Sequence, residues 1–261
     1  MEFLLYVMSG ALVGLIVGIT GIGGGSLMTP LLLLFGIPPH IAVGTDLLYA
    51  AITKVGGVVA HHKQNTIKWS VALLMVAGSV PTAIITGIIL SAYFEDYQQY
   101  TGIITTSLGV MLLITATLLL FRRKLQLFAE QQSNLNKKSW IQSHRMSLTV
   151  IMGVVLGIFV TLSSVGAGAI GTVVLLILYP YLRSIHIVGT DLAHAVPLTL
   201  VGGLIHLGLG NVDFALLGAL LVGSIPAIHL GSRIGSKLPE GLLRNALACI
   251  LMFLGVKYIV F

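Results

Sequence analysis

The sequence predicts an all-α polytopic membrane protein made of two inverted repeats, and three observations lead to this fold class. Hydrophobic residues make up 56% of the chain and charged residues only 8%, far from the usual balance of a soluble protein. Several windows of about 20 residues carry almost no charge, which is long enough for a helix to cross a bilayer core. A pattern of residues also recurs along the chain at one constant spacing. Each repeat is predicted to hold a glycine-broken helical hairpin followed by three transmembrane helices.

The first repeat, residues 1–121, is predicted to begin with the hairpin. Two apolar segments, 3–20 and 26–36, flank a glycine-rich break that reads T-G-I-G-G-G-S-L-M-T-P from residue 20. Glycine at this density disfavours a continuous helix and lets the backbone approach a ligand closely. Amides freed by a break inside a bilayer need partners, so the break belongs inside the protein or beside a cavity.

The returning arm of this hairpin is short. Residues 26–36, at 1.5 Å per residue, reach only about 16 Å, roughly half of the hydrocarbon core. The sequence therefore favours a hairpin whose tip reaches towards the midplane, although two full crossings would give the same topology. Thr29 and Pro30 are predicted as the N-cap and first residue of the returning helix, with Ser26 as an alternative cap.

Three helices are predicted to follow the hairpin, over residues 41–60, 69–92 and 98–121. A basic loop, residues 122–147, then separates the repeats. It carries six basic residues against one acid, Glu130, which gives a net charge of +5. A short positive loop in a membrane protein marks the cytoplasmic side, so this loop is interpreted as cytoplasmic rather than as a nucleic-acid site.

The second repeat, residues 148–261, reproduces the order of the first. The segment Val188-Gly-Thr-Asp-Leu192 matches Val43-Gly-Thr-Asp-Leu47 at an offset of 145 residues. The same offset, without gaps, pairs further residues of the two halves: Gly21 with Gly166, Gly23 with Gly168, Gly57 with Gly202, His61 with His206, Gly78-Ser79 with Gly223-Ser224, and Pro81 with Pro226. Matches that persist at one offset over this length indicate a duplication.

The distribution of charge predicts the relative orientation of the repeats. With the basic loop in the cytoplasm, counting crossings backwards places the acidic loop at Glu95 and Asp96 outside. Counting forwards places Arg183 inside and Asp213 outside. Loops related by the repeat therefore fall on opposite faces of the membrane. The two repeats are predicted to be inverted, with both termini outside.

The two glycine-rich tips are candidate anion sites. Tips that meet near the midplane would bring helix N-termini there, and their free N–H groups and positive dipole ends favour an anion. The alternative is that the glycines only allow close helix packing. The candidate residues are Gly23, Gly24, Gly25 and Ser26 in the first tip, and Gly166, Gly168, Gly171 and Thr172 in the second, where Gly171 and Thr172 are predicted to open the returning helix.

Three charged residues, Asp46, Lys54 and Asp191, are predicted to lie within membrane spans. A charge in this position is costly and indicates function by default. Lys54 has no counterpart in the second repeat, where Thr199 takes its place. It could therefore attract an anion or neutralise Asp46.

Thr190, Asp191 and His194 lie close enough in sequence to share one helix face. A histidine beside an intramembrane aspartate can relay protons, so Asp46, Asp191 and His194 are the candidate coupling residues. Thr45 and Thr190 join Lys54 and the glycine tips in the candidate substrate site. The alternative for the two aspartates is a structural role, such as capping a helix.

Catalytic and cofactor chemistry find little support in the sequence. His61, His62 and His206 are predicted at helix ends near the membrane interface, and a zinc site from His61 and His62 would lack a third ligand. The chain has no G-x-x-x-x-G-K-[ST], serine elbow or H-E-x-x-H motif, and Cys249 is its only cysteine. The sequence therefore predicts no catalytic residue, no metal and no cofactor.

A family resemblance rests on three features together. The paired glycine-rich breaks, the two V-G-T-D-L copies, and G-S-V-P with G-S-I-P resemble the sulfite exporter TauE/SafE family over nearly the whole chain. The resemblance implies a transporter of small anions, often sulfur oxyanions or organosulfonates, in the cytoplasmic membrane. It also implies that the glycine tips and the V-G-T-D segments line the substrate path. The second tip, G-A-G-A-I-G, is less glycine-rich than the first, which departs from an evenly shared site.

On this resemblance the two repeats form one transport domain, a secondary transporter that moves a small anion such as sulfite by alternating access, with protons as a candidate coupling ion. Its expected partners are the anion and the lipid bilayer, a homodimer is compatible with the sequence, and nucleic acid is not expected. Two alternatives stay open. In one, the aspartates hold a cation such as Na⁺; in the other, Asp191 and His194 serve an intramembrane enzyme, for which a nucleophile or metal set is missing.

Overall fold

The computed structural model describes residues 2–20, 27–93, 97–134, 140–235 and 240–260. Within these ranges the chain is helical, as predicted, and strands do not occur. The helices, in chain order, are α1 (Glu2–Thr20), α2 (Met28–Leu34), α3 (Pro39–Lys63), α4 (Trp69–Tyr93), α5 (Tyr97–Asn134), α6 (Trp140–Ser143), α7 (Arg145–Ser163), α8 (Ala169–Leu178), α9 (Ser184–Gly208), α10 (Phe214–Gly235) and α11 (Glu240–Val260).

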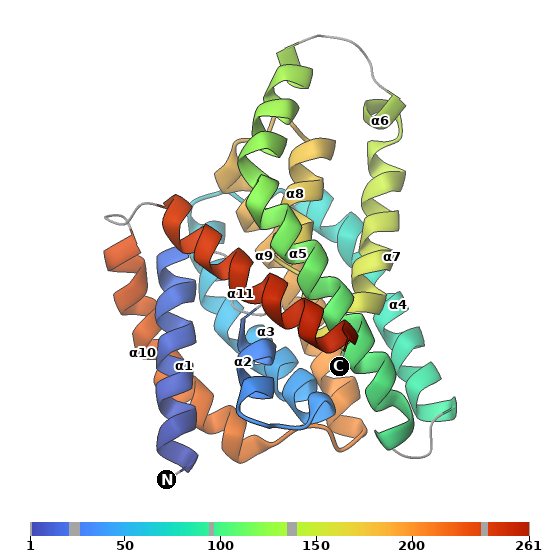
Figure 1. Cartoon of the computed structure of the whole chain (residues 1–261). Helices are drawn as coiled ribbons and strands as arrows, with labels where there is room; N and C mark the ends of the chain where they lie inside the picture. The colour runs from blue at the N-terminus through green and yellow to red at the C-terminus, as the bar shows by residue number, and fades with distance from the viewer. Residues whose placement is uncertain (1, 21–26, 94–96, 135–139, 236–239, 261) are drawn as a thin grey trace.

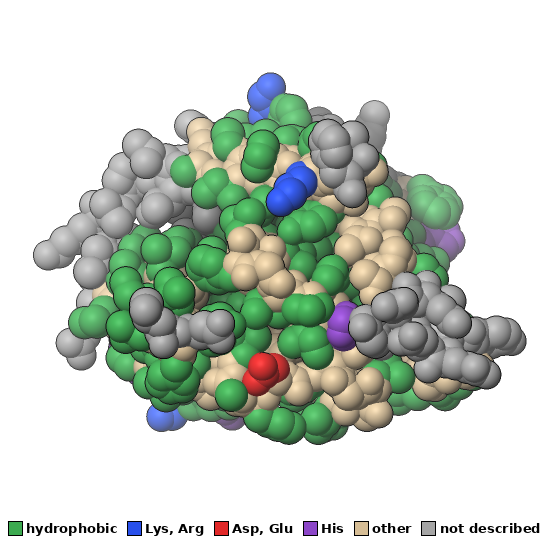
Figure 2. Space-filling model, turned by 60° about the horizontal axis from the view of Figure 1, so that its bottom comes forward, with side chains coloured by type: hydrophobic (Ala, Val, Ile, Leu, Met, Phe, Trp, Pro, Cys, Tyr) green, Lys and Arg blue, Asp and Glu red, His purple; other side chains and the backbone are tan. Residues whose placement is uncertain are grey.

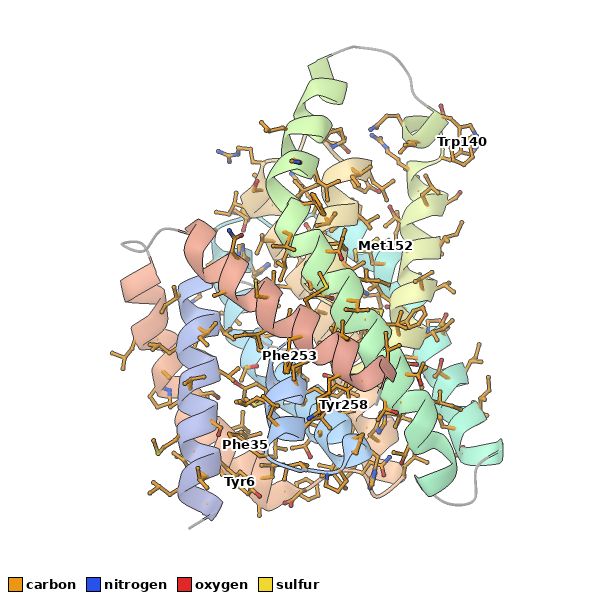
Figure 3. The ribbon with its side chains drawn as sticks, in the orientation of Figure 1. Tyr6, Phe35, Trp140, Met152, Phe253 and Tyr258 are labelled. Carbon is orange, nitrogen blue, oxygen red and sulfur yellow. The ribbon has the colours of Figure 1, made fainter. Side chains whose placement is uncertain are left out.

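Six helices within the described ranges are long and apolar enough to cross a membrane, and they occupy residues of α3, α4, α5, α7, α9 and α10. Their outward side chains are apolar. Figure 2 shows one face of the molecule, on which hydrophobic side chains dominate and charged side chains are few. Large hydrophobic residues such as Phe253 on α11 and Trp140 on α6 are exposed (Figure 3). A surface of this kind is stable against lipid rather than water.

Helices from the two halves of the chain pack in pairs (Figure 1). The two helices α3 and α9 pack against each other, α1 packs against α10 on one flank, and α7 packs against α4 on the other. At the front of the same view, α11 packs across α5. Each pair joins one helix from the first half with one from the second. The two halves are therefore interlocked and share their cores.

Small residues let the flanking helices approach at backbone distance. A side chain at Gly10 on α1 would overlap the backbone of Leu220 on α10, and one at Gly78 on α4 would overlap the carbonyl of Val150 on α7. Close approach through small residues is the usual way in which helices associate in a bilayer, where burial of apolar surface drives association little.

The bounds of α3 and α9 repeat at the offset seen in the sequence. The first and last residues of α3, 39 and 63, lie 145 residues before those of α9, 184 and 208. In Figure 1, α1 starts at the bottom of the molecule beside the N-terminus, and its counterpart α7 starts at the top beside α6. The two helices run in opposite directions along the bundle.

Each half contains a hairpin with one short arm. The arm α2 has 7 residues and α8 has 10, which corresponds to about 10 and 15 Å, so neither crosses a core of about 30 Å. The turn before α8 needs glycine, because Gly166 and Gly168 have φ of +117° and +123°, a region that other residues rarely adopt. Met28 and Leu32 of α2 share one apolar core with Val165 and Ala169 of the second hairpin.

Three local predictions differ from the structure. Residues assigned to the basic loop are helical up to Asn134, because α5 continues beyond the apolar segment that ends at residue 121. Thr29 and Pro30 lie inside α2, whose N-cap is Leu27, so Thr29 is not a cap. Helix α8 begins at Ala169, so Gly171 and Thr172 lie inside its first turn and do not open it. His206 lies in the last turn of α9, as predicted, and is fully buried, with its ring bonded to the Thr161 carbonyl and to Asn211.

Candidate functional site

The two V-G-T-D-L segments lie in α3 and α9, where these helices pack against each other. Their glycines make room for a histidine of the other half. A side chain at Gly189 would come within 2.7 Å of His61 Nδ1, and one at Gly44 would come within 3.0 Å of His206 Cβ. The His61 ring bonds with Thr66 Oγ1 at 2.8 Å, and the His206 ring bonds with Asn211 Nδ2 at 3.2 Å. Close packing of α3 and α9 therefore explains why each motif has a glycine at this position.

The threonines of the two motifs each hold the start of a helix in the other half. Thr45 Oγ1 accepts a hydrogen bond from the backbone N–H of Asp213 at 3.1 Å, immediately before α10. Thr190 Oγ1 accepts one from the backbone N–H of Lys68 at 2.9 Å, immediately before α4. Asp213 and Lys68 are themselves related by the offset of 145 residues. The hydroxyls of Thr45 and Thr190 are thus engaged in a reciprocal pair of contacts.

Asp46 is fully buried and binds the first turn of α2. Its Oδ2 accepts hydrogen bonds from the Thr29 backbone N–H at 3.1 Å and from Thr29 Oγ1 at 2.5 Å. The carboxylate therefore caps a short helix whose N–H groups would otherwise lack acceptors. The hydroxyl of Ser164, at the end of α7, lies beside the same carboxyl group. Asp46 thus brings together the first hairpin and the second.

Asp191, the counterpart of Asp46, is equally buried but makes a different contact. Its carboxyl group lies against Gly171 in the first turn of α8, where a side chain would overlap Oδ1 and come within 2.9 Å of Cγ. Within the described ranges, Oδ1 has no hydrogen-bond partner. The N-cap residue of α8 is Gly168, so no side chain caps this helix from that position. The Thr172 hydroxyl donates a hydrogen bond to the Gly168 carbonyl at 2.6 Å.

Lys54 on α3 is only 4% exposed, and it interacts electrostatically with Asp191 and Asp46. Its Nζ makes no hydrogen bond to any residue that the structure describes. A buried ammonium group carries three donors and is strongly destabilised without acceptors, so this position calls for a ligand or a counterion. Thr199 at the equivalent position of α9 donates its hydroxyl to the Ala195 carbonyl at 2.8 Å.

His194 lies one turn after Asp191 on α9 and joins this cluster. Its Nε2 is hydrogen-bonded to Ser79 Oγ on α4 at 2.9 Å, and Lys54 acts on the ring electrostatically. For Nδ1 the described part of the chain offers no partner. In the first half the equivalent residue is Tyr49, which lies beside Ser224 on α10. We call Lys54, Asp191, His194 and Ser79 the polar cluster.

The structure brings together only part of the candidate site. Asp46, Lys54, Asp191, His194, Gly171 and the tip of the second hairpin meet around α3 and α9, whereas Thr45 and Thr190 hold the starts of α10 and α4. The first-tip candidates Gly23, Gly24, Gly25 and Ser26 lie outside the described residues. Gly166 lies against Met111 of α5.

Two residues of the site were not among the candidates predicted from the sequence. They are Ser79 in the polar cluster and Ser164 beside Asp46. Ser79 belongs to the G-S-V-P segment that recurs as G-S-I-P, so its recurrence was a usable signal. Ser164 has no such signal, since its place beside Asp46 depends on a left-handed turn with φ of 57° at the end of α7. Among the described residues, no group of three or more His, Cys, Asp or Glu side chains is placed to hold a metal ion.

Comparisons with known proteins agree on one family. The family described as "Sulfite exporter TauE/SafE" matches residues 6–258. The chain is 36% identical over 254 residues to the probable membrane transporter protein YjnA of Bacillus subtilis, covering 97% of this chain and 98% of that protein. It is 29% identical over 238 residues to the probable membrane transporter protein YdhB of the same organism, covering 90% and 91%. No solved structure matches the chain.

Proposed function

Because the chain belongs to the sulfite exporter TauE/SafE family and is a membrane transporter, we propose that it moves a small anion through the polar cluster by alternating access. The anion class is a sulfur oxyanion or an organosulfonate. The family description names sulfite export, and related chains are described only as probable membrane transporters.

The observation that carries this proposal is the state of Lys54. The residue is 4% exposed, and its buried ammonium group lacks a hydrogen-bonding acceptor among the described residues. An oxyanion would supply up to three acceptors and the opposite charge, and charge-assisted bonds of this kind are the strongest that a protein makes. The second hairpin tip next to Asp191 adds the N-terminus of α8, whose dipole also favours an anion.

The alternating-access part of the proposal rests on the internal symmetry. The bounds of α3 and α9 repeat at an offset of 145, α1 and α7 run in opposite directions, and Thr45 and Thr190 make reciprocal contacts between the halves. Inverted halves that share a site near the midplane can open it to either side by rocking against each other. In this arrangement Gly23, Gly24, Gly25 and Ser26 line the path from one side and Gly166 to Thr172 from the other.

The proposed location is the cytoplasmic membrane, with the 122–147 segment inside and both termini outside. Replacement of Cys249 and introduction of single cysteines at the termini tests this orientation. An impermeant thiol reagent should label both termini on intact cells. Protection of one terminus but not the other would contradict the inverted arrangement, because inversion with an internal basic segment places both ends on one side.

Substitution of Lys54 tests the proposed site. Lys54→Met keeps the approximate length of the side chain and removes its charge, so affinity for the anion should fall roughly tenfold or more, about 1.4 kcal/mol. The matched control is Lys63→Met, which removes an exposed lysine from the end of the same helix. Uptake of labelled sulfite, sulfate, thiosulfate and methanesulfonate into proteoliposomes measures both. Equal uptake by the two variants would move the anion site away from Lys54.

The cation-coupled alternative has one observation in its favour. Asp46 and Asp191 supply two carboxylates for a single lysine, and the Oδ1 of each has no hydrogen-bond partner within the described segments. A sodium ion takes oxygen ligands of this kind. Uptake that requires a sodium gradient and persists without a pH gradient would favour this function.

A further inference from the structure

We infer that the substrate anion binds Lys54 in place of the electrostatic interaction with Asp191 and that Asp191 binds one proton when this happens, so that each monovalent anion crosses together with one proton. The inference rests on the proposed anion transport and adds to it the coupling ion, its number and the residue that carries it.

The two aspartates are not equivalent as counterions of Lys54. Asp46 is held by two donors of Thr29 and by the N-terminal turn of α2. Its negative charge is therefore stabilised by groups that stay in place whether or not an anion is bound. Asp46 also anchors α2, so its release from Thr29 would leave helix N–H groups without an acceptor.

Asp191 lacks the two hydrogen bonds that hold Asp46. The residue is 1% exposed, and its carboxyl group lies against the backbone of Gly171 rather than at a hydrogen-bond donor. Among the described charged groups, Lys54 is the one that acts on it. The charge of Asp191 is thus stabilised chiefly by the ammonium group that the anion would also bind.

The titratable groups around Asp191 come from few elements. On α9 itself the nearest is His194, and α3 contributes Lys54. Helix α8 presents Gly171, and α4 presents Ser79 through its bond to His194. The only charged residue of α7, Arg145, is its first residue and stacks on Tyr179 and Tyr181 with its Cζ 5.9 and 5.6 Å from the two ring centres. No other described group offers Asp191 a compensating charge.

Charge balance then requires a proton. In the empty site Lys54 and Asp191 together carry no net charge. When a monovalent anion binds Lys54, a second negative charge on Asp191 would be buried without a counterion, which is far more costly than taking up a proton from water. The proton attaches to a carboxyl oxygen of Asp191 and returns to water when the anion leaves. His194 is the poorer acceptor, because Lys54 repels a positively charged ring.

Methanesulfonate is the probe for this inference, because it stays monovalent across the working pH range. Uptake of labelled methanesulfonate into proteoliposomes that contain a pH-sensitive dye gives the number of protons per anion. In the wild type one proton should enter with each anion, and a membrane potential set with potassium and valinomycin should not change the uptake. A pH difference of about one unit should hold about a tenfold anion gradient.

Asp191→Asn keeps the size of the side chain and its contact with Gly171 but cannot bind the proton. This variant should carry the anion alone, so the dye signal disappears, the anion gradient no longer follows the pH gradient, and the membrane potential now drives uptake. Asp46→Asn is the matched variant in the other repeat. It should lower the thermal stability, because α2 loses its charged acceptor, but leave the ratio at one proton per anion.

The outcomes separate the inference from the proposed function. Anion uptake by the wild type without proton entry, or an unchanged proton ratio in Asp191→Asn, would overturn the inference and leave anion transport intact. A loss of proton coupling in Asp46→Asn but not in Asp191→Asn would assign the proton to Asp46. That result would overturn the inference as well. Absence of uptake of every tested anion by the wild type would overturn the proposed function and this inference together.

Discussion

The V-G-T-D-L segments of α3 and α9 make equivalent contacts through their glycines and threonines, but their aspartates have diverged. In both copies the glycine lies against a histidine of the other half, and the threonine accepts a hydrogen bond from the residue before a helix of the other half. Asp46 Oδ2 accepts two hydrogen bonds from Thr29, whereas the carboxyl group of Asp191 lies against Gly171. The Oδ1 atom of both aspartates is without a hydrogen-bond partner within the described ranges. The two copies therefore share the contacts of their glycines and threonines but differ in the contacts of their aspartates.

Substitutions within the repeat explain the difference between the aspartates. The residue that corresponds to Thr29 in the second half is Val174, which has no hydroxyl to donate. The first residue of α2, Met28, corresponds to Val173, but α8 already begins at Ala169, so α8 is longer by about one turn at this end. Asp191 therefore lies against the Gly171 backbone in the first turn of α8 and has no hydroxyl donor that corresponds to Thr29. The second half thus holds one carboxylate without the Thr29-type donor, near a lysine that has no counterpart at position 199.

The largest effect is expected from filling the space beside Asp191. Gly171→Ala would place a methyl group on top of Asp191 Oδ1, so either the carboxyl group or α8 must move. Transport should be lost, and overpacking of this kind costs about 1–3 kcal/mol of stability. The control is Gly218→Ala on α10, which has open space around it and should be neutral or slightly stabilising. Wild-type transport by Gly171→Ala would show that the position of Asp191 is unimportant.

A moderate effect is expected from making the first copy resemble the second. Thr29→Val removes the hydroxyl that donates to Asp46 and supplies the residue type found at Val174. Hydrogen bonds to charged groups are worth about 1.5–3 kcal/mol, so thermal unfolding of the purified protein should begin at a distinctly lower temperature. The backbone N–H of Thr29 still reaches Asp46, so the fold should persist. Unchanged stability would mean that Asp46 does not depend on this bond.

The fold was predictable because its signals are long and cumulative. Apolar windows that span a bilayer identified the helices, and the bounds of α3 and α9 follow the offset of 145 residues found in the sequence. The continuation of α5 was not predictable from hydropathy. Beyond residue 121 the chain becomes polar, which resembles a loop on a hydropathy scale, although residues such as Leu125, Gln126 and Glu130 favour a helix in water as well.

The candidate site was only partly predictable. Lys54, Asp191 and His194 stood out because a charged or titratable group within a span is costly whatever its partners are. The partners themselves depend on tertiary contacts. The bond from Thr29 to Asp46 requires α2 to return against α3, and the bond from Ser79 to His194 joins two halves of the chain. The burial of His206 was not predictable for the same reason, because its ring bonds the Thr161 carbonyl of a helix that is distant in sequence.

The smallest effect is expected where the two copies agree. Thr45→Val and Thr190→Val each remove one hydroxyl that holds the start of a helix in the other half. Hydrogen bonds between membrane helices average about 0.6 kcal/mol, so each variant should lower stability by a similar small amount. The two sites share no partner, and the double variant should equal the sum of the single variants within about 0.5 kcal/mol. The control is Thr117→Val on α5, whose hydroxyl bonds only the Leu113 carbonyl of its own helix. Thermal unfolding of the four variants and the wild type checks the comparison. A clearly larger loss of stability in one of the two single variants would mean that the halves are not joined by equivalent contacts.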